Sequence, residues 1–211
     1  MLRRHFIAAL ALCALGVAPA AGQEAWQQQA GRLAALLNWH SGSVVAEIGA
    51  GHGQLTLLAA ERVGPSGRVF TTELNETELA RLQELAANHA NIAPRKAARA
   101  DTNLPPACCD SIFMRLVYHH FTDPAQIDAS LFRSLKPGGR LAIIDREPPL
   151  GSSVPEGAPK NRGGHGMPQK TLITELTAAG FVVEGVHDDW PGLSENNKTY
   201  CVVFRKPEPS R

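Results

Sequence analysis

The chain carries no excess of charge of either sign. Its 21 Lys and Arg residues are balanced by 20 Asp and Glu, which gives a formal net charge of +1 at pH 7. Proteins that hold nucleic acid through its phosphates gather basic residues in a patch, a stripe or a tail. No such cluster stands out along this sequence, so we expect no nucleic-acid partner. The composition leaves the oligomeric state open.

Cysteine is scarce, with four residues in the chain. The spacings Cys-x-x-Cys and His-x-x-x-His, which are typical of zinc sites, are missing, so the sequence predicts no metal cluster. The neighbours Cys108 and Cys109 are poorly placed to pair with each other, because the geometry of such a bridge is strained. A bridge from one of them to Cys201 stays open, and it would leave a free thiol.

Apolar runs long enough to span a bilayer are missing as well. The apolar segment 7–17 is short, follows Arg3-Arg4 and precedes the small residues 18–21. This arrangement is typical of a secretory signal peptide, here residues 1–20, and Arg-Arg-x-Phe-Ile resembles a twin-arginine export signal. We therefore expect a single exported domain over 21–211, in the periplasm, with no membrane span after cleavage. Retention in the cytoplasm stays open.

What the chain does have is a glycine-rich turn between a strand and a helix. The apolar run 44–48 predicts a buried strand, Gly49, Gly51 and Gly53 follow, and residues 54–61 predict a helix. This arrangement forms a cradle for nucleotide-like ligands. Dinucleotide loops use Gly-x-Gly-x-x-Gly, but here the third glycine comes one residue early. Glu47, just before the turn, would repel a pyrophosphate and suits a cationic amino group.

The next segments continue an alternation of strands and helices. Residues 67–73 predict a second strand ending in Glu73, which lies about 20 residues after the glycine turn, where doubly wound folds place the carboxylate that binds ribose hydroxyls. Asn75 is a predicted helix cap. The remaining predictions are a helix to about His89, a weak strand over 94–100, strands over 109–117 and 140–145, a helix from Asp123-Pro124 to a stop at 136–139, a last helix over 172–181, and closing antiparallel strands over 182–184 and 200–204. One three-layer α/β domain fits this order.

Two stretches resemble the class I S-adenosylmethionine-dependent methyltransferases. They are Glu47-x-Gly-x-Gly-x-Gly and Leu135-Lys-Pro-Gly-Gly-Arg-Leu141, and the resemblance covers about Val44 to Asp145 by motif. Together with Tyr118-His119-His120, they are most similar to the small-molecule type related to quinone-biosynthesis methyltransferases. The resemblance implies a Rossmann-like, doubly wound sheet, mostly parallel with an antiparallel last strand and with helices on both faces.

The same resemblance implies S-adenosyl-L-methionine as cofactor and a small molecule as methyl acceptor. It places an acid at Asp101 against the adenine amino group, although a turn-forming Asp is the alternative. The residues predicted to bind the cofactor are Glu47, Gly49, Gly51, Gly53, Glu73, Asp101 and Thr102. Two other functions stay open, namely a NAD-dependent Rossmann oxidoreductase and a non-catalytic exported binding protein on the same scaffold.

Catalysis is predicted at His119 and His120, which follow the fourth strand. A free imidazole titrates at about 6.5, which suits a general base at neutral pH. Strand alternation would place Tyr118 and His120 on one face and His119 on the other, and simple packing of both histidines is the alternative. The Pro- and Gly-rich loop over 147–169 is predicted to be flexible and to cover the acceptor, with His165 as a lesser candidate. A plain surface linker is the alternative for this loop.

Overall fold

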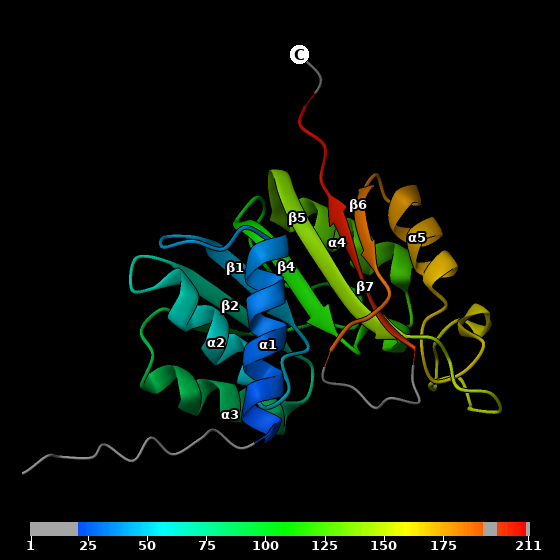
Figure 1. The fold of residues 1–211 in the computed structure, drawn as a ribbon, viewed down its shortest axis with the longest axis horizontal. Coiled ribbons are helices and arrows are strands. Elements are labelled where there is room, and N and C mark those ends of the chain that lie inside the picture. Colours follow the sequence, from blue (N-terminus) through cyan, green and yellow to red (C-terminus); the bar gives the residue numbers. More distant parts are fainter. Residues whose placement is uncertain (1–20, 192–197, 210–211) are drawn as a thin grey trace, which may run out of the picture.

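The computed structural model describes residues 21–191 and 198–209. The predicted signal peptide, residues 1–20, lies outside the described residues. Figure 1 shows the described elements in chain order. They are α1 (Ala21–Leu36), β1 (Val44–Ile48), α2 (Gln54–Val63), β2 (Arg68–Glu73), α3 (Glu76–Ala87), β3 (Ile92–Lys96), β4 (Cys109–Arg115), the short 3-10 helix η1 (Tyr118–His120), α4 (Pro124–Ser134), β5 (Leu135–Arg146), a second 3-10 helix η2 (Lys160–Arg162), α5 (Gln169–Ala178), β6 (Val182–His187) and β7 (Thr199–Arg205).

The strands form one mixed sheet with the order β3-β2-β1-β4-β5-β7-β6. Neighbours from β3 through β5 are parallel, while β7 runs antiparallel to both β5 and β6. The fold prediction is thereby confirmed, including the antiparallel last strand. The chain moves outward from β1 to β2 and β3 and then returns to place β4 on the other side of β1. Open sheets of this kind bind ligands in the crevice at that reversal, at the carboxyl ends of the strands.

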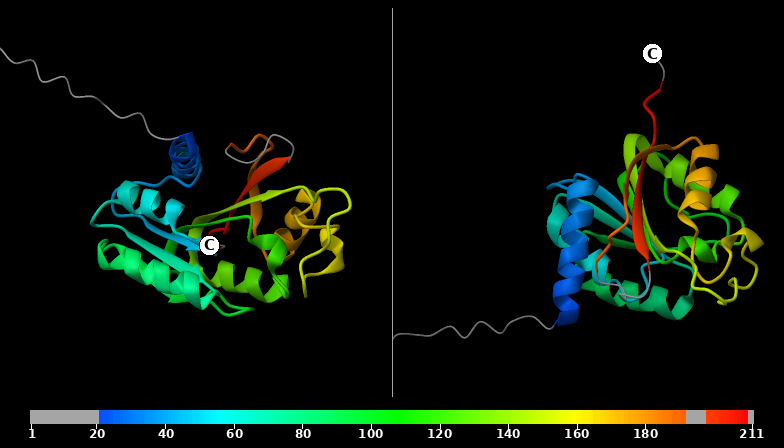
Figure 2. Two further views of the ribbon diagram at one scale, coloured as in Figure 1. Left: turned by 90° about the horizontal axis from the view of Figure 1, so that it is seen from below. Right: turned by 45° about the vertical axis from the view of Figure 1, so that its right-hand side comes forward.

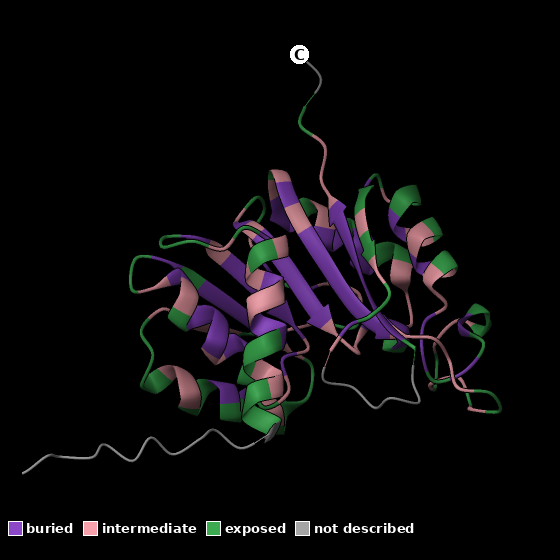
Figure 3. Ribbon diagram, in the orientation of Figure 1, coloured by how far each residue is buried: buried purple, intermediate pink, exposed green. Residues whose placement is uncertain are grey.

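Each face of the sheet packs against helices through its own cluster of buried apolar side chains. Leu33 of α1 and Leu55 of α2 belong to the cluster on one face, while Leu131 of α4 and Leu172 of α5 belong to the other. Figure 2 shows α1 on one side of the sheet and α4 and α5 on the opposite side. The central strands are therefore buried on both faces, as the purple ribbon in Figure 3 shows, and they hold the strand ends in fixed positions.

Two predicted helix starts are confirmed by their caps. The Asn75 side chain accepts hydrogen bonds from the backbone N–H groups of Thr77 and Glu78 at the start of α3. The Asp123 side chain accepts from Gln126 N at 3.1 Å, and Pro124 stands at the first position of α4. Both caps satisfy amides that have no partner within the helix.

Three local predictions were wrong. β4 ends at Arg115, and Tyr118 to His120 form η1 instead of continuing the strand, so strand alternation does not govern the histidines. The expected turn at 136–139 lies inside β5, where Leu135 pairs with Cys109 and Arg140 pairs with Ser111 across a bulge. The weak strand begins earlier than predicted, because β3 covers Ile92–Lys96.

Cys108, Cys109 and Cys201 are free thiols. A bridge between Cys109 and Cys201 is ruled out by topology, because β5 lies between their strands.

Over 21–191 and 198–209, no helix has both the length and the apolar character needed to cross a bilayer.

Candidate active site

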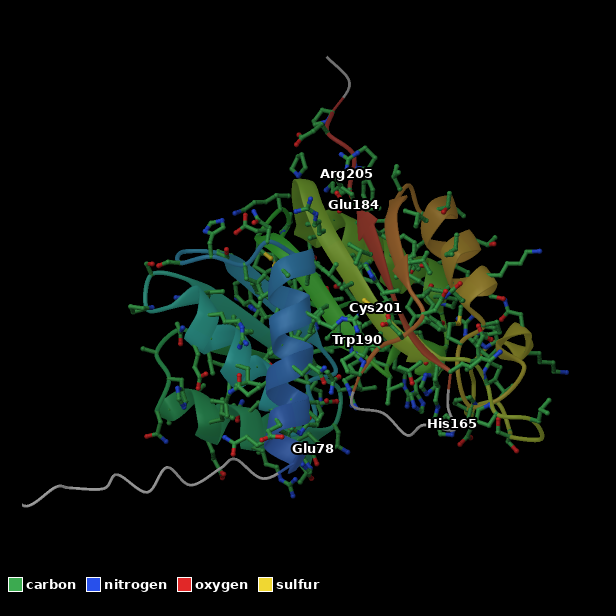
Figure 4. All side chains as sticks on the ribbon, in the orientation of Figure 1. Glu78, His165, Glu184, Trp190, Cys201 and Arg205 are labelled. Carbon is green, nitrogen blue, oxygen red and sulfur yellow. The ribbon has the colours of Figure 1, made fainter. Side chains whose placement is uncertain are left out.

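The predicted site residues gather where β1, β2, β4 and β5 reach their carboxyl ends. Two pockets open there, one of about 270 Å³ and one of about 340 Å³. Both are lined by Gly49, so they meet at the glycine turn. The first is called the β2 pocket below, because it is lined by Glu73 at the end of β2, and the second is called the α1 pocket, because Trp26 of α1 lines it. Figure 4 shows the side chains of this region, with His165 labelled at the same end of the sheet.

The glycine turn has a backbone that L-side chains adopt with difficulty. Gly49 has φ +66°, and a Cβ there would lie 2.7 Å from a methyl carbon of Val117. Gly51 has φ +52°, and a Cβ there would enter open space. The first glycine thus allows a close approach of two segments, while the second keeps the mouth of the α1 pocket clear. Gly53 caps α2 and lines neither pocket.

Glu73 ties the end of β2 to the glycine turn. Its carboxylate accepts hydrogen bonds from the backbone N–H groups of Gly51 at 3.0 Å, Leu74 at 2.7 Å and Asn75 at 3.2 Å. Three backbone donors fix the position of this carboxylate in the wall of the β2 pocket. The structure therefore brings two of the predicted cofactor residues, Glu73 and Gly51, into direct contact.

Asp101 and Thr102 line the same pocket. Asp101 accepts from Asn103 N at 2.7 Å, which is an Asx turn, and from Ser130 Oγ and Arg133 Nη2, both at 2.9 Å. Partial burial opposes its ionisation, but these hydrogen bonds outweigh the burial and lower the pKa of Asp101. Asp101 therefore forms the turn that was the alternative prediction, and it also lines the pocket. Thr102 is buried, and its hydroxyl lies 2.8 Å from Ser130 Oγ.

Glu47 is a buried acid in the wall of the α1 pocket, with 5% of its surface exposed. Burial raises its pKa to about 8, against the opposing effects of a hydrogen bond from the Thr56 hydroxyl and the charge of Arg115. At neutral pH this acid is therefore protonated in the ligand-free protein. A cation placed beside it would convert it to the carboxylate.

Arg115, the last residue of β4, lines the α1 pocket together with Glu47. Its Nε donates to Gln29 Oε1 at 3.0 Å, and its guanidinium lies over the Trp26 ring at 4.7 Å from the centroid. Burial lowers the pKa of Arg115, and the charge of Glu47 acts in the opposite direction. The pocket therefore offers one cation and one acid, the two charges needed to hold the ammonium and carboxylate of an amino acid.

The predicted catalytic histidines have different surroundings. His119 is 1% exposed, and its Nδ1 lies 2.8 and 3.0 Å from the two oxygens of the fully buried Asp145 carboxylate. Because a carboxylate only accepts, Nδ1 carries a proton and donates it to Asp145. His120 is exposed and lines the β2 pocket. Partial burial, followed by the nearby His119 and His165, lowers the pKa of His120.

The loop over 147–169 lies against the second half of the domain and delivers His165 to the other two histidines. Arg162 is fully buried and donates to Glu175 Oε1 of α5 at 2.8 Å. Met167 N donates to Arg146 O at 2.8 Å, and the Tyr200 hydroxyl donates to Met167 O. The His165 ring centroid lies 5.1 Å from that of His119 and 5.2 Å from that of His120. Flexibility of this loop stays a prediction.

Four residues of the site escaped the sequence analysis. Trp26 and Gln29 lie on α1, which no motif announced. Arg115 and Asp145 lie near the ends of β4 and β5. A charged residue near the end of an apolar strand is a signal that could have identified both as site residues. The absence of a metal site stays a prediction, but the structure brings together three histidines that the sequence spacing did not single out. The ligand atoms of His119, His120 and His165 lie within 4.8 Å of one another, and short spacing rules cannot detect residues that meet from distant segments.

Comparison with known proteins supports one chemistry for this site. A family described as a methyltransferase domain matches residues 46–143. The ubiquinone/menaquinone biosynthesis C-methyltransferase UbiE of Marinomonas sp. (strain MWYL1) is 30% identical over 112 residues, which is 52% of this chain and 45% of that enzyme. Nocamycin O-methyltransferase of Saccharothrix syringae is 29% identical over 136 residues, or 64% of this chain and 49% of that enzyme. The matches thus span about half the length of these relatives.

Solved structures share the fold over most of the chain. A SAM-dependent methyltransferase from Aquifex aeolicus superposes with a TM-score of 0.68 at 22% identity, covering 84% of this chain and 89% of that one. A protein from Bordetella parapertussis, described as possibly exported, superposes with a TM-score of 0.64 at 16% identity, covering 87% of this chain and 67% of that one. The comparisons give no support to a NAD-dependent oxidoreductase.

Proposed function

Because the chain belongs to the class I S-adenosylmethionine-dependent methyltransferases, we propose that it binds S-adenosylmethionine across the two joined pockets and methylates a small molecule. When bound, this cofactor supplies a methyl group already activated on a positively charged sulfur. The protein therefore needs chiefly to hold the acceptor in line with that methyl group at short range.

One observation carries the proposal, namely that the α1 pocket combines Glu47 with Arg115 and shares Gly49 with the β2 pocket. The methionine part of the cofactor is an amino acid, with one ammonium and one carboxylate. We assign the ammonium to Glu47 and the carboxylate to Arg115, whose planar guanidinium suits a carboxylate. The spacing Gly-x-Gly-x-Gly, which lacks the Gly-x-Gly-x-x-Gly pattern of dinucleotide loops, disfavours NAD.

The β2 pocket fits the adenosine part. Glu73 offers acceptor oxygens for the two ribose hydroxyls, and we assign this role to it. Asp101 lines the far wall with its carboxylate ionised, and we assign it to the adenine amino group. Thr102 stands beside it, held by Ser130. The glycines at 49, 51 and 53 serve by shaping the turn.

His119 and His120 lie on the acceptor side of this arrangement. His120 reaches the β2 pocket with a pKa lowered by burial, so it is neutral at physiological pH and can accept a proton from an acceptor hydroxyl or activated carbon. His119, fixed by Asp145, supports the same wall. UbiE is by its name a C-methyltransferase of quinone biosynthesis and the nocamycin enzyme an O-methyltransferase, and we infer only a small-molecule acceptor from them.

Calorimetry tests the cofactor assignment. S-adenosylmethionine and S-adenosylhomocysteine should bind with one site per chain, and NAD should not. Arg115→Gln should weaken both interactions strongly, while Arg68→Gln, an exposed arginine at the start of β2, should leave them unchanged. Binding of NAD alone would overturn the assignment. Tight cofactor binding without methyl transfer in a broad acceptor screen would favour a non-catalytic binding protein.

We also propose that the domain is exported after cleavage near residue 20. Support comes from the sequence of the first 20 residues, with its basic start, short apolar core and small residues at 18–21. Cleavage well inside α1 would remove Trp26 from the α1 pocket. Fractionation of cells, followed by sequencing of the mature N-terminus, tests this. A cytoplasmic, unprocessed chain would contradict it.

A further inference from the structure

Three histidines from two distant segments meet beside the β2 pocket, which one of them, His120, lines. His119 and His120 belong to η1, and His165 comes from the loop between β5 and α5. One nitrogen of each ring lies within 4.8 Å of the corresponding nitrogens of the other two. Figure 4 marks His165 at the carboxyl end of the sheet, on the loop beyond β5.

The spacing of the rings is close to that of three imidazoles bound to a single ion. With zinc–nitrogen bonds of about 2.0–2.1 Å, ring centroids of two imidazoles on one tetrahedral ion lie roughly 5 Å apart. The observed centroid distances are 4.3 Å, 5.1 Å and 5.2 Å. His120 and His165 are exposed, so both rings are free to turn by the small amount that would bring all three nitrogens to bonding distance.

One of the three histidines is already held from behind by a carboxylate. The buried Asp145 carboxylate accepts a hydrogen bond from Nδ1 of His119 at 2.8 Å, which leaves Nε2 as the ring nitrogen available to a metal. Histidines that bind a metal almost always donate their other ring N–H to such a partner, which orients the ring and makes it a better ligand. A histidine that only filled space would not require a fully buried carboxylate behind it.

The surroundings favour a transition metal with an open coordination position. Imidazole ligands suit zinc, copper, iron and nickel, whereas magnesium and calcium prefer oxygen. Zinc sites with three protein ligands leave the fourth position to water or substrate. His120 also lines the β2 pocket, so that open position faces the place proposed for the acceptor.

From this geometry we infer that His119, His120 and His165 bind a divalent transition metal, zinc by preference, with Asp145 as the positioning residue behind His119. The role of the ion in transfer rests on the proposed function. An acceptor hydroxyl or thiol bound to the ion would lose its proton to solvent more readily. The new bond then joins the methyl carbon to that oxygen or sulfur, and the electron pair of the broken carbon–sulfur bond stays on the sulfur of the donor.

His120 cannot bind a metal and act as a general base through the same nitrogen. A coordinated nitrogen has no lone pair left to accept a proton. If the histidines act as ligands, removal of metal by a chelator abolishes transfer, and added zinc restores it. If His120 acts as a free base, the chelated protein keeps its full activity, and zinc inhibits.

Binding of the metal alone is the primary test, with the full-length protein purified without a histidine tag and stripped by a chelator. Calorimetry with Zn²⁺ and absorption spectroscopy with Co²⁺ should give one tetrahedral site per chain. His165→Ala, at an exposed position, should abolish the Co²⁺ bands while the fold persists by circular dichroism. Asp145→Asn should weaken Zn²⁺ binding roughly 10–100-fold, and His89→Ala, exposed and far from the cluster, should bind like the wild type.

Equal metal binding by the wild type and His165→Ala, or no Co²⁺ bands in the wild type, would overturn the inference. Titration of the same preparations with S-adenosylhomocysteine separates this result from failure of the proposed function. Lost cofactor binding with intact metal binding would refute only the methyltransferase proposal, and the reverse result would refute only the metal site.

Discussion

The substitution Glu47→Gln examines the acid that distinguishes this site from a dinucleotide site. Gln keeps the size and shape of the side chain but cannot ionise. Glu47 is buried, hydrogen-bonded to Thr56, and has a pKa raised by burial from 4.5 to about 8. Between these two pH values the acid is protonated in the folded protein and ionised in the unfolded chain. Folding therefore takes up a proton, and the variant lacks this uptake.

The consequence for stability has a definite sign. A carboxyl whose pKa is higher in the folded state stabilises the fold most below its unfolded pKa, and that contribution is lost as pH rises to the folded pKa. At about 1.36 kcal/mol per pKa unit, the loss between pH 4.5 and 8 is on the order of 4 kcal/mol for the wild type. Glu47→Gln should lack this decline, so its stability should exceed that of the wild type most clearly near pH 8.

Urea unfolding at a series of pH values from 5 to 8.5 measures this difference. Glu84→Gln is the matched control, because Glu84 is an exposed glutamate on α3. The control should follow the wild-type curve at every pH, while Glu47→Gln should diverge from it as pH rises. Parallel curves for Glu47→Gln and the wild type would show that Glu47 is ionised in the folded protein, and the reasoning would fail.

Cofactor binding should reverse the protonation. An ammonium next to Glu47 favours the carboxylate, so binding of S-adenosylmethionine near pH 6.5 should release up to one proton. Calorimetry in two buffers with different ionisation enthalpies counts released protons directly. Glu47→Gln should bind more weakly and release none. Binding without proton release in the wild type would remove Glu47 from the ammonium site, whatever the affinity.

Three further predictions concern single positions in the same region. Glu73→Ala should weaken cofactor binding by about 1–3 kcal/mol, because buried polar partners are left unmet; an unchanged dissociation constant in calorimetry would remove Glu73 from the ribose site. His120→Ala should spare cofactor binding and slow methyl transfer, and unchanged turnover with an unchanged pH profile would exclude a direct role. Gly49→Ala should cost roughly 2–3 kcal/mol in urea unfolding, since it forces a positive φ and a contact with Val117; Gly22→Ala, in an open position on α1, should not destabilise, and equal effects would contradict this account.

The fold was predictable because its signals are local. Apolar runs between turn residues located β1, β2 and β4, and caps at Asn75 and Asp123 located two helix starts. The order of these elements then left few topologies for the sheet. The errors came where tertiary contacts override local signals. Lys136 to Gly139 carry turn residues, yet pairing of Leu135 with Cys109 draws them into β5.

The site was predictable only in part, for the same reason. The glycine turn and Glu73 belong to one strand–turn–helix unit and its neighbour, so their spacing along the chain reflects their spacing in the fold. Arg115 and Trp26 meet because α1 packs over the end of β4, and no short-range pattern records that contact. Asp145 and His119 likewise meet only because β5 pairs with β4 and η1 turns back over the strand ends.

The arrangement of the pockets around β1 explains why the charges are divided as they are. The α1 pocket lies on one side of the glycine turn, with a neutral acid and a cation. The β2 pocket lies on the other, with ionised Asp101 and the anchored Glu73. The proposed cofactor matches this division, with its amino-acid end in the α1 pocket and the hydroxyl and amine donors of its adenosine end in the β2 pocket. Because His120 lines the β2 pocket and not the α1 pocket, we expect the acceptor to approach between the proposed adenosine site and the three histidines.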